Sequence, residues 1–390
     1  MKKKILAFTA IRSEYDLLSS LYFLFEEDSE IDFRLIVSGA HLSKKRGLTV
    51  NDILKDGFNI LEKIKTLDED HNDNDDKASR LKSSGNLLTK AIKAVIDFNP
   101  DLIIFAGDRE EVIIASIIAG YLEIPSVHFY GGDYVADSHI DNPVRNACSK
   151  LSTIHMVSIE EHKNRLISMG EESERIHVVG SIALDKFRNP VKFSKKQIFN
   201  KLNLSTKNEK IALLIFHPIP KERKFSALIF KNILNALSDK EVFGFVSFPN
   251  IDPGNIDIIN AIKEFENDSN FFFYKNLSRE LFLSIYKSVD FIIGNSSSGI
   301  LESASIPIPC INVGYRQKNR KSNANVIYSK TDVKSISESI KYSISKENLI
   351  KISKINNIYG NGFSSKKAYE LIKNNDFKNL IYKDIDPLKI

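Results

Sequence analysis

The stretch FIIGNSSSGILESAS, residues 291–305, passes from an apolar run through a polar turn into a segment of helical character. This order is typical of a buried strand that leads into a helix. The first N–H groups of a helix lack partners and carry partial positive charge. Backbone and hydroxyl groups at Ser296, Ser297, Ser298 and Gly299 could therefore hold a phosphate. The alternative is that Ser298 only caps the helix, because serine is a common N-cap. A capping box with Glu302 would need a hydroxyl that Gly299 lacks.

The same change from apolar strand to amphipathic segment recurs along the whole chain. Candidate strands lie at 5–9, 33–39, 102–107, 126–132, 154–158 and 176–180, and again at 211–217, 242–248, 271–275, 291–294 and 309–314. Candidate helices lie at 86–98, 110–121, 159–169, 225–238 and 256–266. Such alternation is typical of parallel sheets covered by helices on both faces. The sequence predicts an α/β protein with two doubly wound, Rossmann-like domains facing a cleft, residues 1–184 and 185–362.

Composition narrows the class of protein. The chain has 390 residues, of which 42% are hydrophobic and 27% charged, as in ordinary globular proteins. No apolar run approaches the roughly 18 residues of a membrane span, and the net charge of +5 comes from scattered lysines. Cys148 and Cys310 are too few for a disulfide framework or a zinc site. We expect a cytoplasmic protein with no membrane or nucleic-acid partner.

Polar side chains follow several of the predicted strands. In open parallel sheets, ligands bind outside the carboxyl ends of the strands. The residues at these positions are Arg12, His41, Asp108, Arg109 and Asp133 in the first half, and His217, Asn250, Arg316 and Gln317 in the second. Arg316 and Gln317 favour a phosphorylated ligand for the serine-rich turn, and Glu302 could accept hydrogen bonds from ribose hydroxyls.

Three carboxylates, Asp108, Asp133 and Asp141, are candidates for acid–base chemistry. Crowded carboxylates push their pKa values apart, so that one can act as an acid while another stays ionised. Each also has a structural interpretation. Asp108 could pair with Arg109, Asp133 could cap the next helix, and Asp141 resembles an N-cap with Pro143 in the first turn. His217 could equally be a buried structural histidine.

Motifs in both halves resemble the hydrolysing UDP-N-acetylglucosamine 2-epimerases. The second half carries GNSSSG with Glu302 and INVGYRQKNR (311–320). The first half carries AIRSEYDLL (10–18), SGAHLSKKRG (38–47), AGDREE (106–111), GGD (131–133) and DNPVRNACSKLS (141–152). GSIALD (180–185) and FHP (216–218) also fall in order. The resemblance spans about residues 4 to 375 and implies a glycosyltransferase-B type fold, with residues 363–390 crossing back to the first domain.

The resemblance also implies a mechanism. UDP leaves C1 while C2 loses its proton, and water then adds to the 2-acetamidoglycal to release N-acetylmannosamine for sialic-type acid biosynthesis. Asp108, Asp133 and Asp141 match the family's catalytic carboxylates, and the residues named above, with Arg145, would hold the UDP-sugar. The family needs no cofactor or metal, and it implies a homodimer or homotetramer.

Two departures from the family pattern concern the sugar. Asp133 stands where the family usually has glutamate, and Asn146 stands where it usually has histidine. A UDP-4-amino-4,6-dideoxy relative of N-acetylglucosamine, on the path to a legionaminic-type acid, is therefore an alternative substrate. A UDP-sugar glycosyltransferase on the same fold and a non-catalytic UDP-sugar sensor are alternatives of other classes.

Overall fold

The computed structural model describes residues 2–67, 77–135, 140–205, 207–249, 254–383 and 386. Its contacts divide the chain into two compact units. The first unit comprises Met1–Tyr134, Ile140–Asp185 and Tyr359–Ile390, and the second consists mainly of Lys186–Ile358. Each unit is built around its own sheet.

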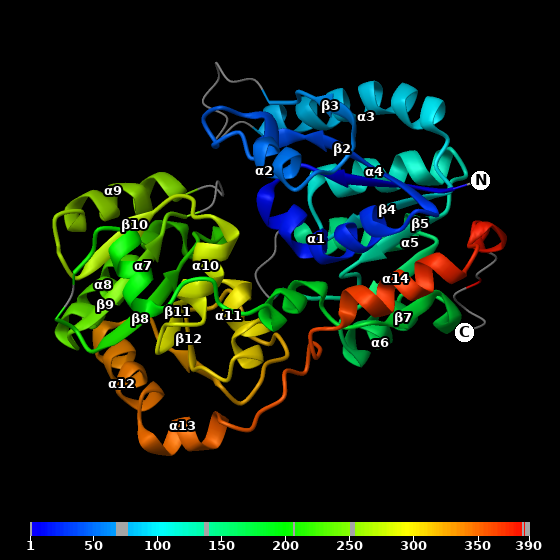
Figure 1. Ribbon diagram of the computed structural model, residues 1–390. Helices are drawn as coiled ribbons and strands as arrows, with labels where there is room; N and C mark the ends of the chain where they lie inside the picture. The colour runs from blue at the N-terminus through cyan, green and yellow to red at the C-terminus, as the bar shows by residue number, and fades with distance from the viewer. Residues whose placement is uncertain are drawn as a thin grey trace. The chain divides into compact units, whose positions relative to one another are not determined.

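The first unit holds a seven-stranded parallel sheet with the order β3-β2-β1-β4-β5-β6-β7 (Figure 1). Its strands are β1 Lys3–Thr9, β2 Ile31–Ser38, β3 Ile60–Ile64, β4 Leu102–Ala106, β5 Ser126–Phe129, β6 Ile154–Val157 and β7 Ile176–Val178. Its helices are α1 Arg12–Glu27, α2 Val50–Lys55, α3 Lys77–Phe98, α4 Glu110–Tyr121, α5 Asp141–Leu151, α6 Glu160–Ser168 and α14 Ser364–Asn374. Two apolar clusters fill the space between sheet and helices, one containing α1 and α14 and the other α3 and α4.

The second unit repeats this plan with six parallel strands in the order β10-β9-β8-β11-β12-β13. Its strands are β8 Lys210–Ile215, β9 Val242–Ser247, β10 Phe271–Tyr274, β11 Phe291–Gly294, β12 Cys310–Val313 and β13 Val326–Ser329. Its helices are α7 Lys195–Lys201, α8 Ser226–Asp239, α9 Asn255–Phe265, α10 Arg279–Tyr286, α11 Ser297–Leu301, α12 Val333–Ser343 and α13 Lys346–Ile352. The predicted α/β class with two doubly wound parallel sheets is confirmed.

The strands that the sequence analysis missed are β3 and β13, and each lies at the edge of its sheet. An edge strand has one neighbour and exposes part of its surface, so its sequence need not be a continuous apolar run. Glu62 and Lys63 are exposed in β3, and Tyr328 is exposed in β13. The central strands, and the edge strands β7 and β10, carry the apolar runs that made them recognisable.

Strand order places the functional loops. In each sheet the order reverses between two central strands, β1 and β4 in the first and β8 and β11 in the second. The loops that leave these two strands run to opposite sides and open a crevice where ligands of such folds bind. The loop before α1 and the Gly107–Arg109 loop lie at the first switch point. The loop after β8 and the serine-rich turn after β11 lie at the second.

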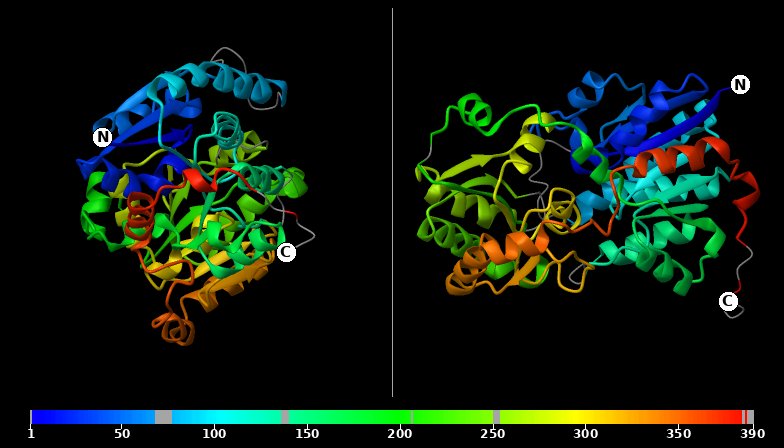
Figure 2. Two further views of the ribbon diagram at one scale, coloured as in Figure 1. Left: turned by 90° about the vertical axis from the view of Figure 1, so that its right-hand side faces the viewer. Right: turned by 60° about the horizontal axis from the view of Figure 1, so that its bottom comes forward.

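Helix α14 packs beside α1 on the first unit (Figures 1 and 2). Ala368 and Ile372 join the apolar cluster of α1. The Asp185 carboxylate accepts the Ser364 and Ser365 amides at 3.1 and 2.7 Å. Asp185 thereby satisfies N–H groups at the start of α14 that no earlier helical residue could bond.

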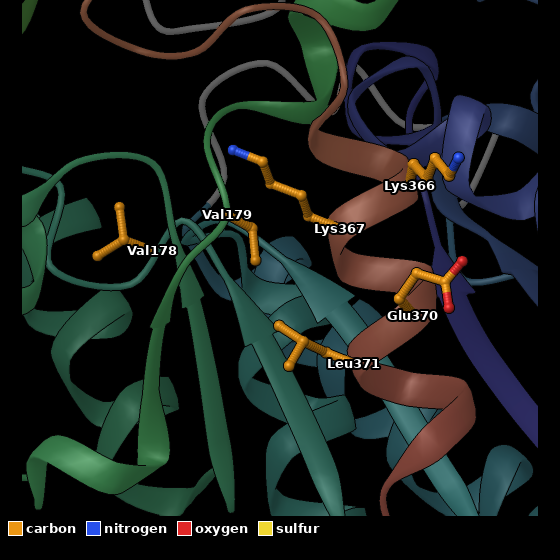
Figure 3. Close-up of a pocket in the computed structure, with 6 residues that line it drawn as sticks. All are labelled: Val178, Val179, Lys366, Lys367, Glu370 and Leu371. Carbon is orange, nitrogen blue, oxygen red and sulfur yellow. The ribbon is translucent and has the colours of Figure 1, made fainter.

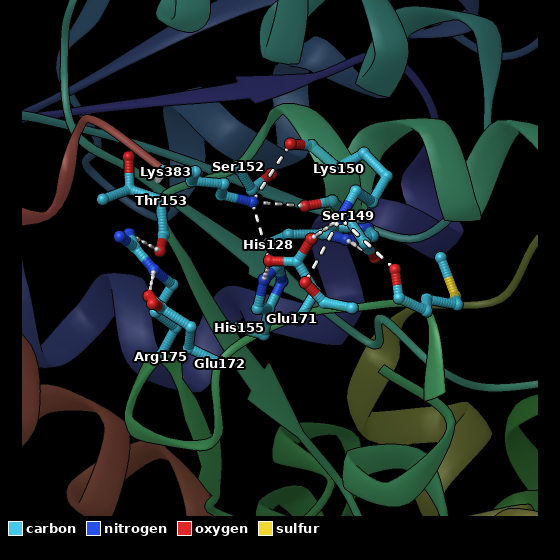
Figure 4. Close-up of polar contacts among 12 residues, drawn as sticks. His128, Ser149, Lys150, Ser152, Thr153, His155, Glu171, Glu172, Arg175 and Lys383 are labelled. Atoms are coloured by element: carbon cyan, nitrogen blue, oxygen red, sulfur yellow. Dashed lines mark hydrogen bonds and ion pairs between the residues drawn. The ribbon is translucent and has the colours of Figure 1, made fainter. Parts of the chain in front are cut away.

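A buried polar cluster fastens the tail that follows α14 (Figure 4). Glu171 contacts Lys150 at 2.7 Å, His155 at 2.9 Å and Lys383 at 2.7 Å. Burial raises the pKa of Glu171, but the His155 hydrogen bond and the charges of Lys383 and Lys150 outweigh it and hold the pKa at about 2. Lys383 also donates to the Ser149 and Lys150 carbonyls at 3.2 and 3.0 Å, at the end of α5. Among the helices described, none has both the length and the apolar character that a membrane crossing requires.

Candidate active site

One guanidinium brings two of the predicted carboxylates together. Asp108 follows β4 and Asp133 follows β5, while Arg145 projects from α5. Arg145 Nη2 contacts Asp108 Oδ2, and Arg145 Nη1 lies 3.5 Å from Asp133 Oδ2. The side chains of Arg145 and Asp133 are each 6% exposed, whereas that of Asp108 is 23% exposed. The cluster of one cation and two carboxylates carries one excess negative charge at a strand end.

The local ion pair that the sequence allowed, between Asp108 and Arg109, is not the one that forms. Asp108 pairs with Arg145, 37 residues away. Arg109 lies 3.2 Å from Glu111 and 3.6 Å from Glu110. The Asp108 carboxylate is thereby held toward α5 instead of toward its own loop.

The turn after β5 explains why a glycine directly precedes Asp133. Tyr130 has a φ of 65° and Gly132 a φ of 70°, both in the left-handed region. A Cβ on Gly132 would lie 2.2 Å from the His162 carbonyl oxygen, which only glycine avoids. A left-handed conformation is strained for a bulky residue such as Tyr130. The turn aims the Tyr130 carbonyl at Arg145 Nη1, which donates to it at 3.1 Å.

Asp133 meets a histidine that the sequence analysis did not single out. His162 Nε2, on α6, lies 3.4 Å from Asp133 Oδ1, and His162 is 2% exposed. The alternative that Asp133 caps the following helix is wrong, because the residue before α5 is Ile140. Asp133 Oδ1 instead accepts the amide of the next residue, Tyr134, at 2.8 Å. His162 lies in the polar segment EEHKNR, which reads as an exposed helix surface.

Asp141 is the first residue of α5 and not its N-cap. Pro143 lies in the first turn, as expected. Asp141 precedes Arg145 by four residues, so the two lie on one face of the helix, one turn apart. The third predicted carboxylate is therefore carried by the same helix as the guanidinium.

The other predicted residues of the first unit differ in placement. Arg12 begins α1 and lies 3.6 Å from Asp16. His41 is fully buried, and its ring nitrogens lie 3.0 Å from Thr9 Oγ1 and 2.8 Å from Thr49 Oγ1. His41 has the surroundings of a structural histidine, and its contact with substrate stays a prediction.

In the second unit, Asn295 locks the two loops of the switch point together. Asn295 Oδ1 accepts the His217 amide and Asn295 Nδ2 donates to the His217 carbonyl, both at 2.8 Å. The Asn295 carbonyl in turn accepts Arg316 Nη1 at 3.0 Å and Gln317 Nε2 at 3.1 Å. Gln317 is 1% exposed, so its first role is to hold this turn. Burial, and then the charge of Arg316, lowers the pKa of His217 to about 3, so the imidazole is neutral.

The N-cap of the helix after the serine-rich turn lies two residues earlier than expected. Ser296, not Ser298, is the N-cap of α11, and its Oγ accepts the Ser298 amide at 3.3 Å. Ser298 Oγ donates to Glu302 Oε2 at 3.0 Å. Gly299 is required for packing, because a Cβ there would lie 2.6 Å from Cys310 Sγ. Helix α11 has five residues, so its dipole is short and the charge of Arg316 matters more for an anion.

Glu302 has a cationic neighbour that the sequence analysis missed. Lys186 Nζ lies 2.9 Å from Glu302 Oε2, and Glu302 is 7% exposed. Ser297 is the first residue of α11 and is half-buried. Asn250, the remaining predicted ligand-binding residue, lies outside the described residues.

Two of the cavities formed by the described residues lie in the first unit. A cavity of about 130 Å³ is lined by α1 and by the loop that carries Asp108 and Arg109. A larger one of about 450 Å³ lies between β7 and α14 and is lined by Val178, Val179, Lys366, Lys367, Glu370 and Leu371 (Figure 3). None of the predicted site residues lines the larger cavity, so the smaller one belongs to the candidate site. Among the described residues, no group of three or more His, Cys, Asp or Glu side chains is placed to hold a metal.

Comparison with known proteins identifies the family. A family model described as UDP-N-acetylglucosamine 2-epimerase matches residues 24–373. The chain is 33% identical over 375 residues, 96% of both chains, to the UDP-N,N'-diacetylbacillosamine 2-epimerase (hydrolyzing) of Legionella pneumophila. It is 33% identical over 329 residues, 84% of both chains, to the GDP/UDP-N,N'-diacetylbacillosamine 2-epimerase (hydrolyzing) of Campylobacter jejuni. The fold matches that of the UDP-GlcNAc 2-epimerase from Neisseria meningitidis bound to UDP-GlcNAc, with a TM-score of 0.79, 18% identity and coverage of 95% and 100%. The chain therefore belongs to the UDP-N-acetylglucosamine 2-epimerase family.

Proposed function

We propose that this protein is a hydrolysing 2-epimerase whose substrate is UDP-N,N'-diacetylbacillosamine. The two relatives at 33% identity are named for this sugar and for hydrolysis. The changes at Asp133 and Asn146 also suggest an altered sugar pocket. From the motifs alone, UDP-N-acetylglucosamine was the first choice of substrate and the 4-amino-4,6-dideoxy sugar was the alternative. The proposal here exchanges these two.

The proposed reaction is an elimination followed by hydration. A carboxylate removes the proton from C2, the C1–O bond breaks, and UDP leaves with that electron pair. Water then adds across the resulting double bond, with the proton going to the opposite face of C2 and the hydroxyl to C1. The products are UDP and the free sugar with inverted C2.

The observation that carries this proposal is the Asp108–Arg145–Asp133 cluster at the switch point of the first sheet. One guanidinium cannot neutralise two carboxylates, so the cluster can accept a proton. The imidazole of His162, 3.4 Å from Asp133, offers a route for that proton to leave or return. We propose Asp108, Asp133 and Asp141 as the catalytic carboxylates, with Arg12 and Arg109 facing the diphosphate or sugar.

The second unit is proposed to hold the nucleotide. Arg316 would meet the diphosphate, since charge-assisted bonds from arginine suit phosphate oxygens. Ser296, Ser297 and the neutral His217 would complete the polar wall. Glu302 would accept hydrogen bonds from ribose hydroxyls, while Lys186 Nζ at 2.9 Å holds the Glu302 carboxylate in place.

A second candidate substrate is UDP-N-acetylglucosamine, because the solved Neisseria enzyme of the same fold is bound to it. Parallel incubations with the two UDP-sugars in deuterated water, without an acceptor, separate the candidates. We expect UDP and a reducing sugar with deuterium at C2 to appear faster from the diacetylbacillosamine donor. Faster turnover of UDP-N-acetylglucosamine would reverse the assignment. Intact donors in both tubes would overturn the proposed hydrolysis and favour a glycosyltransferase.

A further inference from the structure

The first turn of α1 contains a buried carboxyl group that the proposed mechanism leaves unused. Glu14 is 6% exposed, and its Oε2 accepts the Ala10 amide at 2.9 Å. The Ala10 carbonyl accepts the His41 amide at 3.2 Å, so this loop is fastened from both sides. If Glu14 only capped the start of α1, its hydrogen bond with the Ala10 amide would be explained and nothing more would be needed.

The surroundings of Glu14 go beyond those of a cap. Glu14, Ser13 and Leu17 of α1 line the cavity of about 130 Å³, and the opposite wall is Ala106–Arg109. Glu14 and Asp108 therefore face the same small space at the switch point. Among the described residues, no lysine or arginine nitrogen lies within the 4.0 Å of an ion pair from the Glu14 carboxyl. The nearby guanidinium of Arg109 contacts Glu110 and Glu111, and that of Arg145 contacts Asp108 and Asp133.

We propose that Glu14 is a buried acid of the first-unit site that stays protonated in the active enzyme, so that it adds no negative charge to the cavity that Asp108 also lines. Glu14 acts through Asp108 and is a positioning residue, not a catalytic one. This role rests on the proposed function, because the substrate would bring the negative charge of a diphosphate to the same switch point.

The charges around Glu14 agree with this assignment. Burial first, and then the negative charge of Glu111, raises the pKa of Glu14 to about 8. The Ala10 amide and the charge of Arg109 act in the opposite direction, and Asp108 raises the pKa further. On the same helix, burial first, and then the charge of Glu14, raises the pKa of the Tyr22 phenol.

Glu14→Gln tests the protonation state without any substrate. Glutamine keeps an acceptor for the Ala10 amide and imitates the protonated acid. The folded-state pKa of about 8 lies above the ordinary 4.5, so an ionisable Glu14 costs the folded state more as pH rises from about 4.5 to 8. We expect the melting temperature of Glu14→Gln to match that of the wild type at pH 5 and to exceed it increasingly up to pH 9. Glu27→Gln, at the exposed end of α1, is the matched control and should show no such trend.

A Glu14→Gln variant less stable than the wild type at every pH above 5 would show an ionised cap and overturn the proposal. The second readout is kcat/KM against pH. We expect the wild type to lose about tenfold per pH unit above about 8 and Glu14→Gln to lose this decline. An unchanged alkaline decline in Glu14→Gln would also overturn the proposal. A wild type inactive on both UDP-sugars would refute the proposed function, while the melting curves would still decide the state of Glu14.

Discussion

Arg145 Nη1 lies 3.5 Å from Asp133 Oδ2, and the same guanidinium contacts Asp108 through its other terminal nitrogen. The planar fork of arginine can serve two carboxylates at once, which the single ammonium of lysine cannot do in the same geometry. We expect Arg145→Lys to release one of the two carboxylates and to lower kcat more than it changes the affinity for UDP. Turnover and UDP calorimetry measure the two effects separately. Lower affinity with unchanged kcat would place Arg145 in nucleotide binding instead.

Asp133→Asn keeps the shape of the side chain but removes its charge and its ability to accept a proton. If Asp133 takes part in proton transfer at C2, kcat should fall by about 10²- to 10⁴-fold, the usual contribution of a general acid or base. Deuterium incorporation at C2 should stop, while UDP affinity stays nearly unchanged. Asp101→Asn, at a partly exposed position before β4, is a control of the same chemistry. A variant with wild-type turnover would remove Asp133 from the mechanism.

Asn295 should matter for both stability and UDP binding. Its side chain holds the amide and the carbonyl of His217, and its backbone holds Arg316. Asn295→Ala removes the side-chain partner of the His217 amide and carbonyl but keeps the backbone carbonyl that accepts Arg316, and each hydrogen-bonding group left unsatisfied costs about 1–3 kcal/mol. We expect a lower melting temperature and weaker UDP binding together. Unchanged UDP affinity in a folded variant would separate this turn from the nucleotide site.

Ser297→Ala should weaken UDP binding by about 1 kcal/mol, the usual net value of one hydrogen bond. Arg316→Ala should cost more, because a bond from a charged donor to phosphate is stronger. The control is Ser339→Ala on α12, where the hydroxyl only bonds the Ser335 carbonyl. Titration calorimetry with UDP alone checks all three, and equal affinities throughout would refute the proposed nucleotide site.

The buried Glu171 cluster should make the protein sensitive to acid. The pKa of Glu171 is about 2, below its ordinary 4.5, so its stabilising effect is present above about 4.5 and is lost as pH falls toward 2. Burial lowers the pKa of His155 below 6.5, so the unfolded chain takes up that proton first and stability also falls below pH 6.5. We expect the free energy of unfolding to decline from about pH 6.5 downward and Glu171→Gln to flatten the decline between 4.5 and 2.

Two lysines of the same tail provide a matched comparison for this cluster. Lys383 contacts the buried Glu171 at 2.7 Å, whereas Lys378 contacts the partly exposed Asp101 at 3.3 Å. Exposed ion pairs contribute about 0–1 kcal/mol, while breaking a buried pair leaves a buried charge without compensation. Lys383→Ala should therefore destabilise the protein clearly more than Lys378→Ala in denaturant unfolding. Equal losses would show that the Glu171 cluster does not anchor the tail.

The sequence by itself determined the two parallel sheets, because buried central strands need continuous apolar runs and several of these runs alternate with segments of helical character. It also predicted Asp108 and Asp133 at the ligand-binding edge, because both directly follow such strands, whereas Arg145 was expected only from the family resemblance. The edge strands β3 and β13 were not predicted, because a strand with one neighbour can expose polar or large side chains, here Glu62, Lys63 and Tyr328.

Only the tertiary structure decided which of these residues meet. Asp108 pairs with Arg145 rather than with its neighbour Arg109, and Asp133 meets His162 on another helix. The local sequence pattern also did not predict which serine caps α11, nor that Lys186 pairs with Glu302. The physical reason is that parallel strands bring loops distant in the chain to one edge of the sheet. Which side chains meet there depends on their length and burial at that edge. The spacing of the residues along the chain does not predict these contacts.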